Sequence, residues 1–220
     1  MIPAVGAEFV WRIEDLLDLY AEPHDPARPV VGFDETSKQL VAETRTPLPM
    51  APGQPERCDT EYERNGTANL FLLCQPLGGW RHVEATDRRT KHDFALQMRA
   101  LVDRHFPDAE TIRVVLDNLN THTPAALYEA FPPTEARLIL KQLEFHYTPV
   151  HGSWLNMAEI EIAILGRECL RRRAGDRATL ERQVAALEAE RNQQRRTITW
   201  SFTAYDARTK LRRLYPIPQS

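Results

Sequence analysis

The alternation of hydrophobic and polar positions along the chain predicts short strands and amphipathic helices. Apolar residues from Phe9 to Tyr20 recur at steps of three and four, which predicts an amphipathic helix that packs on the core or links two modules. Three prolines then lead, extended, into the apolar run Val30–Phe33, a predicted strand. Residues 39–44 predict a second strand, and the proline-rich residues 47–55 predict an irregular loop.

The next third of the chain predicts a hairpin, a strand and a crossover helix. Asn65-Gly66 lies between two strand-like runs within residues 61–75, which is typical of a two-residue hairpin turn. Residues 80–85 predict a further strand. The helical spacing of residues 90–106, followed by the apolar run Ile112–Leu116, indicates a β-α-β connection that makes this strand parallel to the first.

The remaining pattern completes an α/β fold, a mixed sheet flanked by helices. The helix that starts near Trp154 has Ser153 as its expected N-cap. Helices are expected at 124–131, 134–140, 154–170, 179–195 and 206–214, with a last strand at 143–148 and a closing segment at 197–202.

Three carboxylates occupy positions from which a fold can bring them together. Asp117 follows a buried strand at its C-terminal tip, where open α/β sheets place their chemistry, and Asp34 follows the first strand in the same way. Glu159 lies at the edge of the apolar stripe of the helix from Trp154, whereas Glu161 lies about 200° around the helical wheel. Only one of the two glutamates can face a shared site. Taken singly, each acid is more often a solvated surface residue than a ligand.

Six motifs follow one another along the chain. They are D-E-T-S-K-Q-L at 34–40, G-Q-P-E-R at 53–57, Y-E-R-N-G-T-A-N-L-F at 62–71, G-W-R-H-V at 79–83, D-N-L-N-T-H at 117–122 and H-G-S-W-L-N-M-A-E-I at 151–160. Together they resemble the transposases of the insertion sequence 630 family, bacterial relatives of mariner. The resemblance covers nearly the whole chain and implies a ribonuclease-H-like catalytic domain.

The resemblance also implies an Asp, Asp, Glu triad that binds two Mg²⁺ (or Mn²⁺) ions. Carried over residue by residue, the catalytic and metal-binding triad is Asp34, Asp117 and Glu159. The 42-residue step from Asp117 to Glu159 is longer than mariner relatives usually show. The extra length is most easily placed in a helical segment at 132–142.

The implied function is DNA strand cleavage and strand transfer during transposition of an insertion sequence. The implied partners are transposon ends and target DNA, with a homodimer as the active complex. Family members begin with helix-turn-helix modules, and the residues before Phe9 are too few to encode one. The alternatives are therefore an inactive fragment, a DNA-binding regulator, or a nuclease of the same fold that cleaves without strand transfer.

Four further residues are candidates for supporting the triad or contacting DNA. Asn118 is expected to hydrogen-bond near the metal ligands, and His122 either contacts phosphate or has a satisfied structural role. Trp154 either stacks on a base or packs. Asn156 forms an N-x-x-E pattern with the helix glutamate. A zinc site at His146 and His151 is disfavoured because no third ligand follows in spacing.

Composition and charge set limits on these readings. The net charge of the 220 residues is −3, but residues 1–150 carry −8 and residues 151–220 carry +5, so a basic surface is expected near the C-terminus. The three cysteines have no CxxC spacing, which disfavours a disulfide framework or a zinc knuckle. Cys74 and Cys169 are expected in the core.

The expected organisation is a linker helix and extended segment at 1–29, a catalytic core at 30–170 and a basic helical segment at 171–220 packed on it. No apolar run approaches the roughly 18 residues of a membrane span. We therefore expect a cytoplasmic protein without a membrane partner, associated with the nucleoid when it acts.

Overall fold

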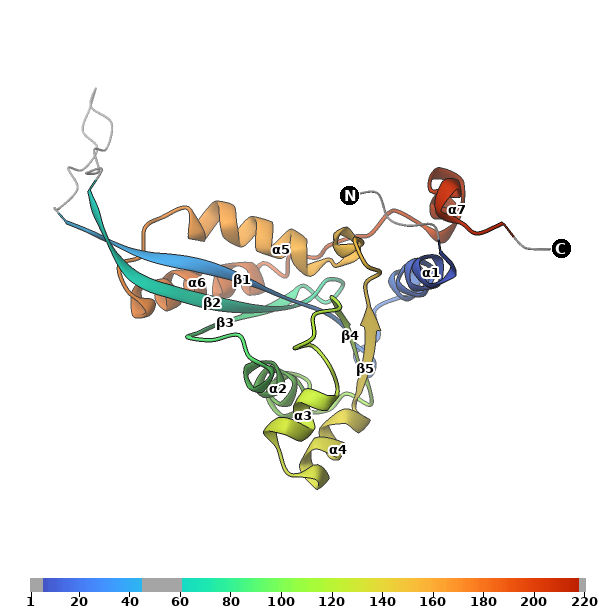
Figure 1. The fold of residues 1–220 in the computed structure, drawn as a ribbon, viewed down its shortest axis with the longest axis horizontal. Helices are drawn as coiled ribbons and strands as arrows, with labels where there is room; N and C mark the ends of the chain where they lie inside the picture. Colours follow the sequence, from blue (N-terminus) through green and yellow to red (C-terminus); the bar gives the residue numbers. More distant parts are fainter. Residues whose placement is uncertain (1–5, 45–60, 218–220) are drawn as a thin grey trace.

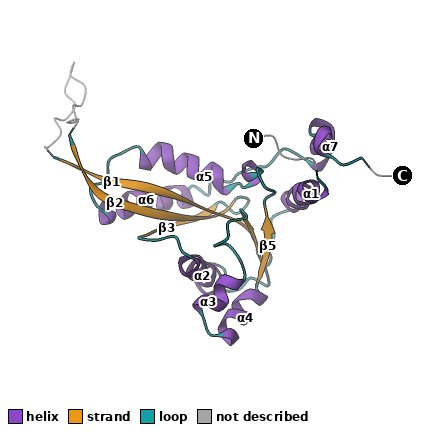
Figure 2. Ribbon diagram, in the orientation of Figure 1, coloured by secondary structure: helices purple, strands orange, loops and turns teal. Residues whose placement is uncertain are grey.

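A single mixed sheet organises the chain. The structure, a computed structural model, describes residues 6–44 and 61–217. The sheet has five described strands in the order β3-β2-β1-β4-β5 (Figures 1 and 2). The strands are β1 Val30–Glu43, β2 Tyr62–Gln75, β3 Trp80–Thr86, β4 Ile112–Leu116 and β5 Leu143–Tyr147. β2 is antiparallel to both β1 and β3, whereas β4 is parallel to both β1 and β5.

Helices cover both faces of this sheet, as Figure 1 shows. One face is covered by α2, its π-helical continuation, α3 and α4, and the other by α5 and α6, while α1 and α7 lie together near the β4–β5 edge. The helices are α1 Ala7–Ala21, α2 Lys91–Ala100 with the π-helical turn Leu101–His105, α3 Ala125–Ala130, α4 Pro133–Lys141, α5 Ala158–Leu165 with the π-helical turn Gly166–Leu170, α6 Arg177–Gln193 and α7 Ala204–Lys210. The expected mixed sheet flanked by helices is confirmed.

The side-chain alternation of β1 separates the two layers. Val31 and Phe33 are fully buried on the α2 side, where the Phe33 ring contacts the rings of Phe71 and Phe94. Gly32 faces α5 instead, as its close approach to Ala158 shows. Successive strand residues point to opposite faces, so Asp34 shares the face of Gly32.

Two strand predictions are wrong, because β1 and β2 are each one long strand. β1 runs through Asp34 to Glu43, so Asp34 lies within the strand and not at its tip. Asn65-Gly66 forms no hairpin. It lies at a register irregularity opposite Leu40, since Gln39 pairs with Thr67 and Val41 pairs with Arg64. Gly66 supplies the positive φ of 91° there, as glycine does at β-bulges.

The start of the helix after β5 also differs from the prediction. Residues Ser153–Leu155 form a 3₁₀ turn, and α5 begins only at Ala158. Ser153 makes no side-chain cap. Asn156 Oδ1 instead accepts a hydrogen bond of 3.1 Å from the Ala158 amide.

The other predicted elements are present, with small differences at the C-terminus. Residues 197–202 form no regular helix or strand, and α7 begins at Ala204, two residues before the predicted helix, where a capping box between Thr203 and Asp206 fixes its start. Cys74 and Cys169 are buried, as expected. The G-Q-P-E-R motif at 53–57, the proline-rich loop at 47–55 and Cys58 lie outside the described residues. No described helix has both the length and the apolar composition needed to cross a membrane.

Candidate active site

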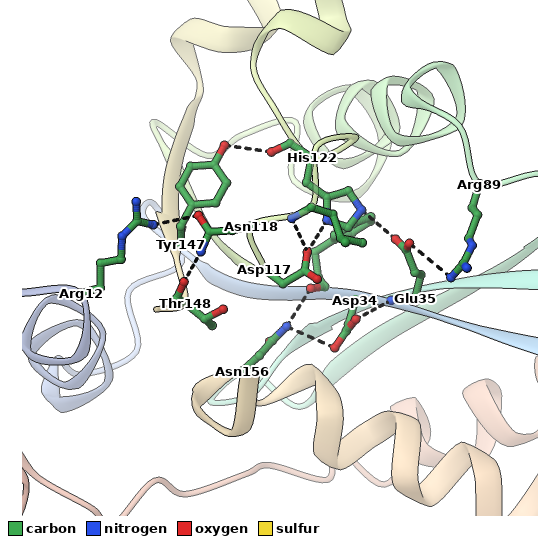
Figure 3. A network of polar contacts seen from close by, with 12 residues as sticks. Arg12, Asp34, Glu35, Arg89, Asp117, Asn118, His122, Tyr147, Thr148 and Asn156 are labelled. Carbon is green, nitrogen blue, oxygen red and sulfur yellow. Dashed lines mark hydrogen bonds and ion pairs between the residues drawn. The ribbon is translucent and has the colours of Figure 1, made fainter. Parts of the chain in front are cut away.

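The three predicted carboxylates lie on neighbouring elements. Gly32 of β1 pairs in parallel with Val115 of β4. Asp34 and Asp117 each follow two residues after these partners, so they lie side by side (Figure 3). Glu159 is in the first turn of α5, which packs against β1. Glu159 and Asp117 both lie close enough to Asp34 for their negative charges to raise its pKa. The fold therefore brings the three acids together.

Asp34 is half-buried. Burial and the neighbouring negative charges raise the pKa of Asp34 to about 7. A hydrogen bond from the Glu35 amide partly offsets this increase. Its Oδ1 accepts a hydrogen bond of 2.8 Å from that amide, and its Oδ2 lies 3.5 Å from Asn156 Nδ2. Asn156 also donates to the Phe33 carbonyl at 2.9 Å. It thus connects the entry of α5 to the strand that carries Asp34.

Asp117 is held through one of its oxygens. Its Oδ1 accepts from His122 Nδ1 at 2.6 Å and from the Leu119 amide at 3.3 Å. The other ring nitrogen of His122 lies 2.7 Å from Glu35 Oε2. Both partners are carboxylates, so both ring nitrogens donate. Burial lowers the pKa of His122, but the hydrogen bonds to Asp117 and Glu35 outweigh it and raise the pKa to about 9.

The position of His122 favours a structural role for this residue over a phosphate contact. The residue is 1% exposed and its two nitrogens are occupied by carboxylates, so neither is available to a phosphate. Glu35, 6% exposed at its side chain, was not among the predicted site residues. The first strand was predicted to end at Phe33, with Asp34 directly after it. Had the strand continued, alternation would have placed Glu35 on the face of Phe33, where His122 lies.

Arg12 is a second residue that the sequence analysis missed. Its Nη1 donates 3.0 Å to Asn118 Oδ1, and its guanidinium lies 5.8 Å from the Tyr147 ring centroid. The Nε of Arg12 donates a hydrogen bond of 2.8 Å to Glu8 Oε1. Asn118 in turn donates to the Thr148 carbonyl. Helix α1 thus packs on the core and also brings a cation beside Asn118, which no sequence pattern indicated (Figure 3).

The two glutamates of α5 occupy different environments, as the helical wheel predicted. Glu159 is exposed, whereas Glu161 is 3% exposed and bonds to Arg81 at 3.1 Å and to Arg191 at 2.7 Å. Arg81 and Arg191 anchor α6 and the following segment to β3. Glu161 is therefore part of the packing between α5, β3 and α6.

Trp154 and His146 make other contacts near the site. Trp154 is 45% exposed, and its ring stacks on that of Trp200 with centroids 6.3 Å apart. It therefore packs on one side and is open to solvent on the other. His146 lies between Asp15 at 2.8 Å and Glu144 at 3.0 Å, contacts that account for both of its ring nitrogens.

The donor chemistry of the site suits a hard divalent cation. As they stand, no three His, Cys, Asp or Glu side chains within residues 6–44 and 61–217 are arranged to hold a metal ion. The triad nonetheless offers only carboxylate oxygens, the ligands that Mg²⁺ and Mn²⁺ prefer. Burial is the main cause of the raised pKa of Asp34, and the negative charges of Glu159, Asp117 and Glu35 raise it further by repulsion. A bound cation would relieve that repulsion.

Comparisons with known proteins show the family of the chain and its fold. A family model described as DDE superfamily endonuclease matches residues 29–181. Among solved structures, the Mos1 mariner paired end complex with Mn is similar at a TM-score of 0.54 and 16% identity, and covers 89% of this chain and 62% of that one. The Mos1 strand transfer complex is similar at 0.52 and 15% identity, with the same coverage. The mariner Mos1 paired end complex with Mg matches at 0.50 and 18% identity, covering 89% of this chain and 64% of that one.

These similarities establish a ribonuclease-H-like fold. The chain spans less than two thirds of the length of the Mos1 chains that it matches. No significant match is found among curated proteins.

Proposed function

The chain belongs to the DDE superfamily endonucleases, and from this premise we propose that it is the catalytic part of a transposase of the insertion sequence 630 family. The convergence of Asp34, Asp117 and Glu159 beside the carboxyl end of β4 carries the proposal. In this proposal residues 30–170 are the catalytic core and residues 171–220 pack on it. The active complex is a homodimer on transposon ends and target DNA, in the cytoplasm.

The three carboxylates would hold two Mg²⁺ or Mn²⁺ ions. Bound there, such ions would lower the pKa of an attacking water or 3′-hydroxyl and would stabilise charge on the leaving oxygen. The chain's own residues supply the arrangement. Asn156 fixes the entry of α5 relative to Asp34, and Asn118 ties the end of β4 to the residue after β5.

Arg12 supports DNA as the substrate. A site formed by Asp34, Asp117 and Glu159 repels a polyanion unless cations compensate, and Arg12 places a guanidinium next to Asn118. Arg89, 55% exposed and 3.8 Å from Glu35, provides a second positive charge next to the chain neighbour of Asp34 (Figure 3).

A strand-transfer assay separates a transposase from a nuclease. We expect the chain, with Mn²⁺ and a DNA duplex that ends in a free 3′-hydroxyl, to join that end to a supercoiled plasmid. Asp117→Asn should abolish joining. Nicking of the plasmid without joined product would support a nuclease of the same fold. DNA binding with neither product would support an inactive remnant or regulator.

A further inference from the structure

A chain of three side chains crosses from β1 to the loop after β4. Glu35 Oε2 lies 2.7 Å from His122 Nε2, and His122 Nδ1 lies 2.6 Å from Asp117 Oδ1. Both distances are short, as charge-assisted hydrogen bonds are. Only Asp117 is appreciably exposed, at 31% of its side chain, against 1% for His122 and 6% for Glu35.

The imidazole of His122 is confined on all sides. The ring of Phe33 meets it edge to face, with centroids 5.1 Å apart, and the ring of Phe94 lies at 5.0 Å. The Tyr147 hydroxyl donates 2.9 Å to the His122 carbonyl and holds its backbone. A ring packed in this way keeps the orientation that its two hydrogen bonds define.

This arrangement leaves Asp117 with a defined free oxygen. Oδ1 is occupied by His122 and by the Leu119 amide. Oδ2 has no hydrogen-bond partner in the part of the chain that the structure describes. Groups that orient a ligand in this way set its geometry and basicity, and replacing them typically weakens metal affinity by about 10- to 100-fold.

Glu35 extends the same restraint to the other aspartate. It is the chain neighbour of Asp34, and the two side chains point to opposite faces of β1. Glu35 therefore fixes His122 relative to the very segment that carries Asp34. One rigid connection then sets the separation of the two aspartates on adjacent strands.

From this geometry, and resting on the proposed metal-dependent function, we infer that Glu35 and His122 are a positioning pair. They hold the Asp117 carboxylate so that one oxygen, Oδ2, faces the divalent cation. Neither residue touches the substrate or the cation.

Two substitutions of His122 separate positioning from simple burial. Asn places an amide nitrogen near the position of Nδ1, so His122→Asn keeps a donor for Asp117 but cannot reach Glu35. Gln places its amide near Nε2, so His122→Gln keeps the contact to Glu35 and loses the donor to Asp117. The measurement is Mn²⁺ affinity of the whole chain without DNA, by electron paramagnetic resonance, together with thermal unfolding of each variant.

We expect the Mn²⁺ affinities of the variants to differ in an order that their unfolding temperatures do not follow. His122→Gln should weaken Mn²⁺ binding by about tenfold or more, and His122→Asn should weaken it clearly less. His146→Gln is the matched control, because His146 also bonds to two carboxylates, Asp15 and Glu144. It should change the unfolding temperature without changing Mn²⁺ affinity.

Asp117→Asn, Glu35→Gln and Glu35→Ala complete the set. Glu35→Gln keeps an acceptor for His122 and should retain most of the affinity. Glu35→Ala removes that acceptor and should weaken Mn²⁺ binding, which keeps the test available if a His122 variant fails to fold. Unchanged Mn²⁺ affinity in His122→Gln, or a loss no larger than that of His146→Gln, would show that Glu35 and His122 do not position Asp117. If His122→Gln fails to fold, wild-type affinity in Glu35→Ala would overturn the pair. Wild-type affinity in Asp117→Asn would overturn both the pair and the proposed function.

Discussion

Gly32 and Ala158 lie so close that a Cβ added to Gly32 would be 3.1 Å from the Ala158 amide nitrogen and 3.3 Å from the Ala158 Cβ. The same carbon would be 3.1 Å from Asn156 Oδ1. A glycine at this position of β1 thus permits the first turn of α5 to lie against the strand. The separation of Asp34 from Glu159 depends on that approach.

Gly32→Val should therefore impair the site by displacing α5. Moving a catalytic group by about 1 Å can lower a rate by about 10²-fold, so we expect a loss of that order in Mn²⁺-dependent plasmid nicking. Gly166→Ala is the control, since nothing lies within 4 Å of a Cβ there. It should retain wild-type nicking. Equal activity of Gly32→Val and wild type would show that the contact does not position Glu159.

The buried cluster of Glu161 with Arg81 and Arg191 should contribute to folding. Removing one partner of a buried ion pair leaves the other charge uncompensated, which costs about 3 kcal/mol. Urea unfolding should show a loss of that size for Glu161→Gln. Glu181→Gln breaks only the exposed contact to Arg177 and should lose less than about 0.5 kcal/mol. Similar losses in the two variants would mean that the buried cluster is no more important than a surface pair.

Arg12 should contribute to DNA binding through phosphate. Replacing one phosphate-contacting cation weakens binding for all sequences and lowers the slope of log affinity against log salt by about 1. We expect this for Arg12→Gln in fluorescence anisotropy with a DNA duplex. Arg137→Gln, on the exposed surface of α4, should leave the slope unchanged. Equal slopes for wild type and Arg12→Gln would remove Arg12 from the DNA contact.

His105 should make the fold sensitive to mild acid. Burial, together with the nearby charges of His82 and Arg104, lowers the pKa of His105 to about 4, and its Nε2 has no partner among the described residues. The folded pKa lies below the unfolded value of about 6.5. The stabilising contribution is therefore present above pH 6.5 and is lost as the pH falls toward 4.

His105→Phe is the variant that tests this dependence. It keeps an aromatic ring beside Trp80, whose centroid lies 5.0 Å from that of His105. The unfolding free energy of the variant should fall less steeply than that of wild type between pH 6.5 and 4. Glu84 and Glu188, which also act on His105, remain in both proteins. Parallel curves would assign the acid sensitivity to other groups.

Most of the sheet and the place of Asp117 after β4 could be predicted from sequence because they follow from local patterns. Ile112–Leu116 is apolar throughout and fully buried, and parallel pairing with β1 follows from the crossover helix. The continuation of β1 beyond Asp34 had no such signal. Residues 34–39 are polar and mostly half-buried or exposed, and they form a strand because β2 pairs with them along their whole length.

The connections around the triad were beyond sequence patterns for a different reason. Glu35 and His122 are 87 residues apart, and Arg12 and Asn118 are 106 residues apart. Each pair meets only because separate strands or helices pack together. Glu161 and Glu159 were distinguishable, since both lie on one helix whose geometry is known in advance.

Comparing Glu159→Gln with Glu161→Gln tests the central assignment most directly. Both changes remove one negative charge with little change of shape, and both can be assayed for Mn²⁺-dependent plasmid nicking below their unfolding temperatures. If Glu159 completes the triad, Glu159→Gln should lose nicking by at least about 10²-fold while its unfolding temperature stays near wild type. Glu161→Gln should lose stability and retain nicking. Loss of nicking in Glu161→Gln and its retention in Glu159→Gln would contradict the assignment of Asp34, Asp117 and Glu159 as the catalytic acids.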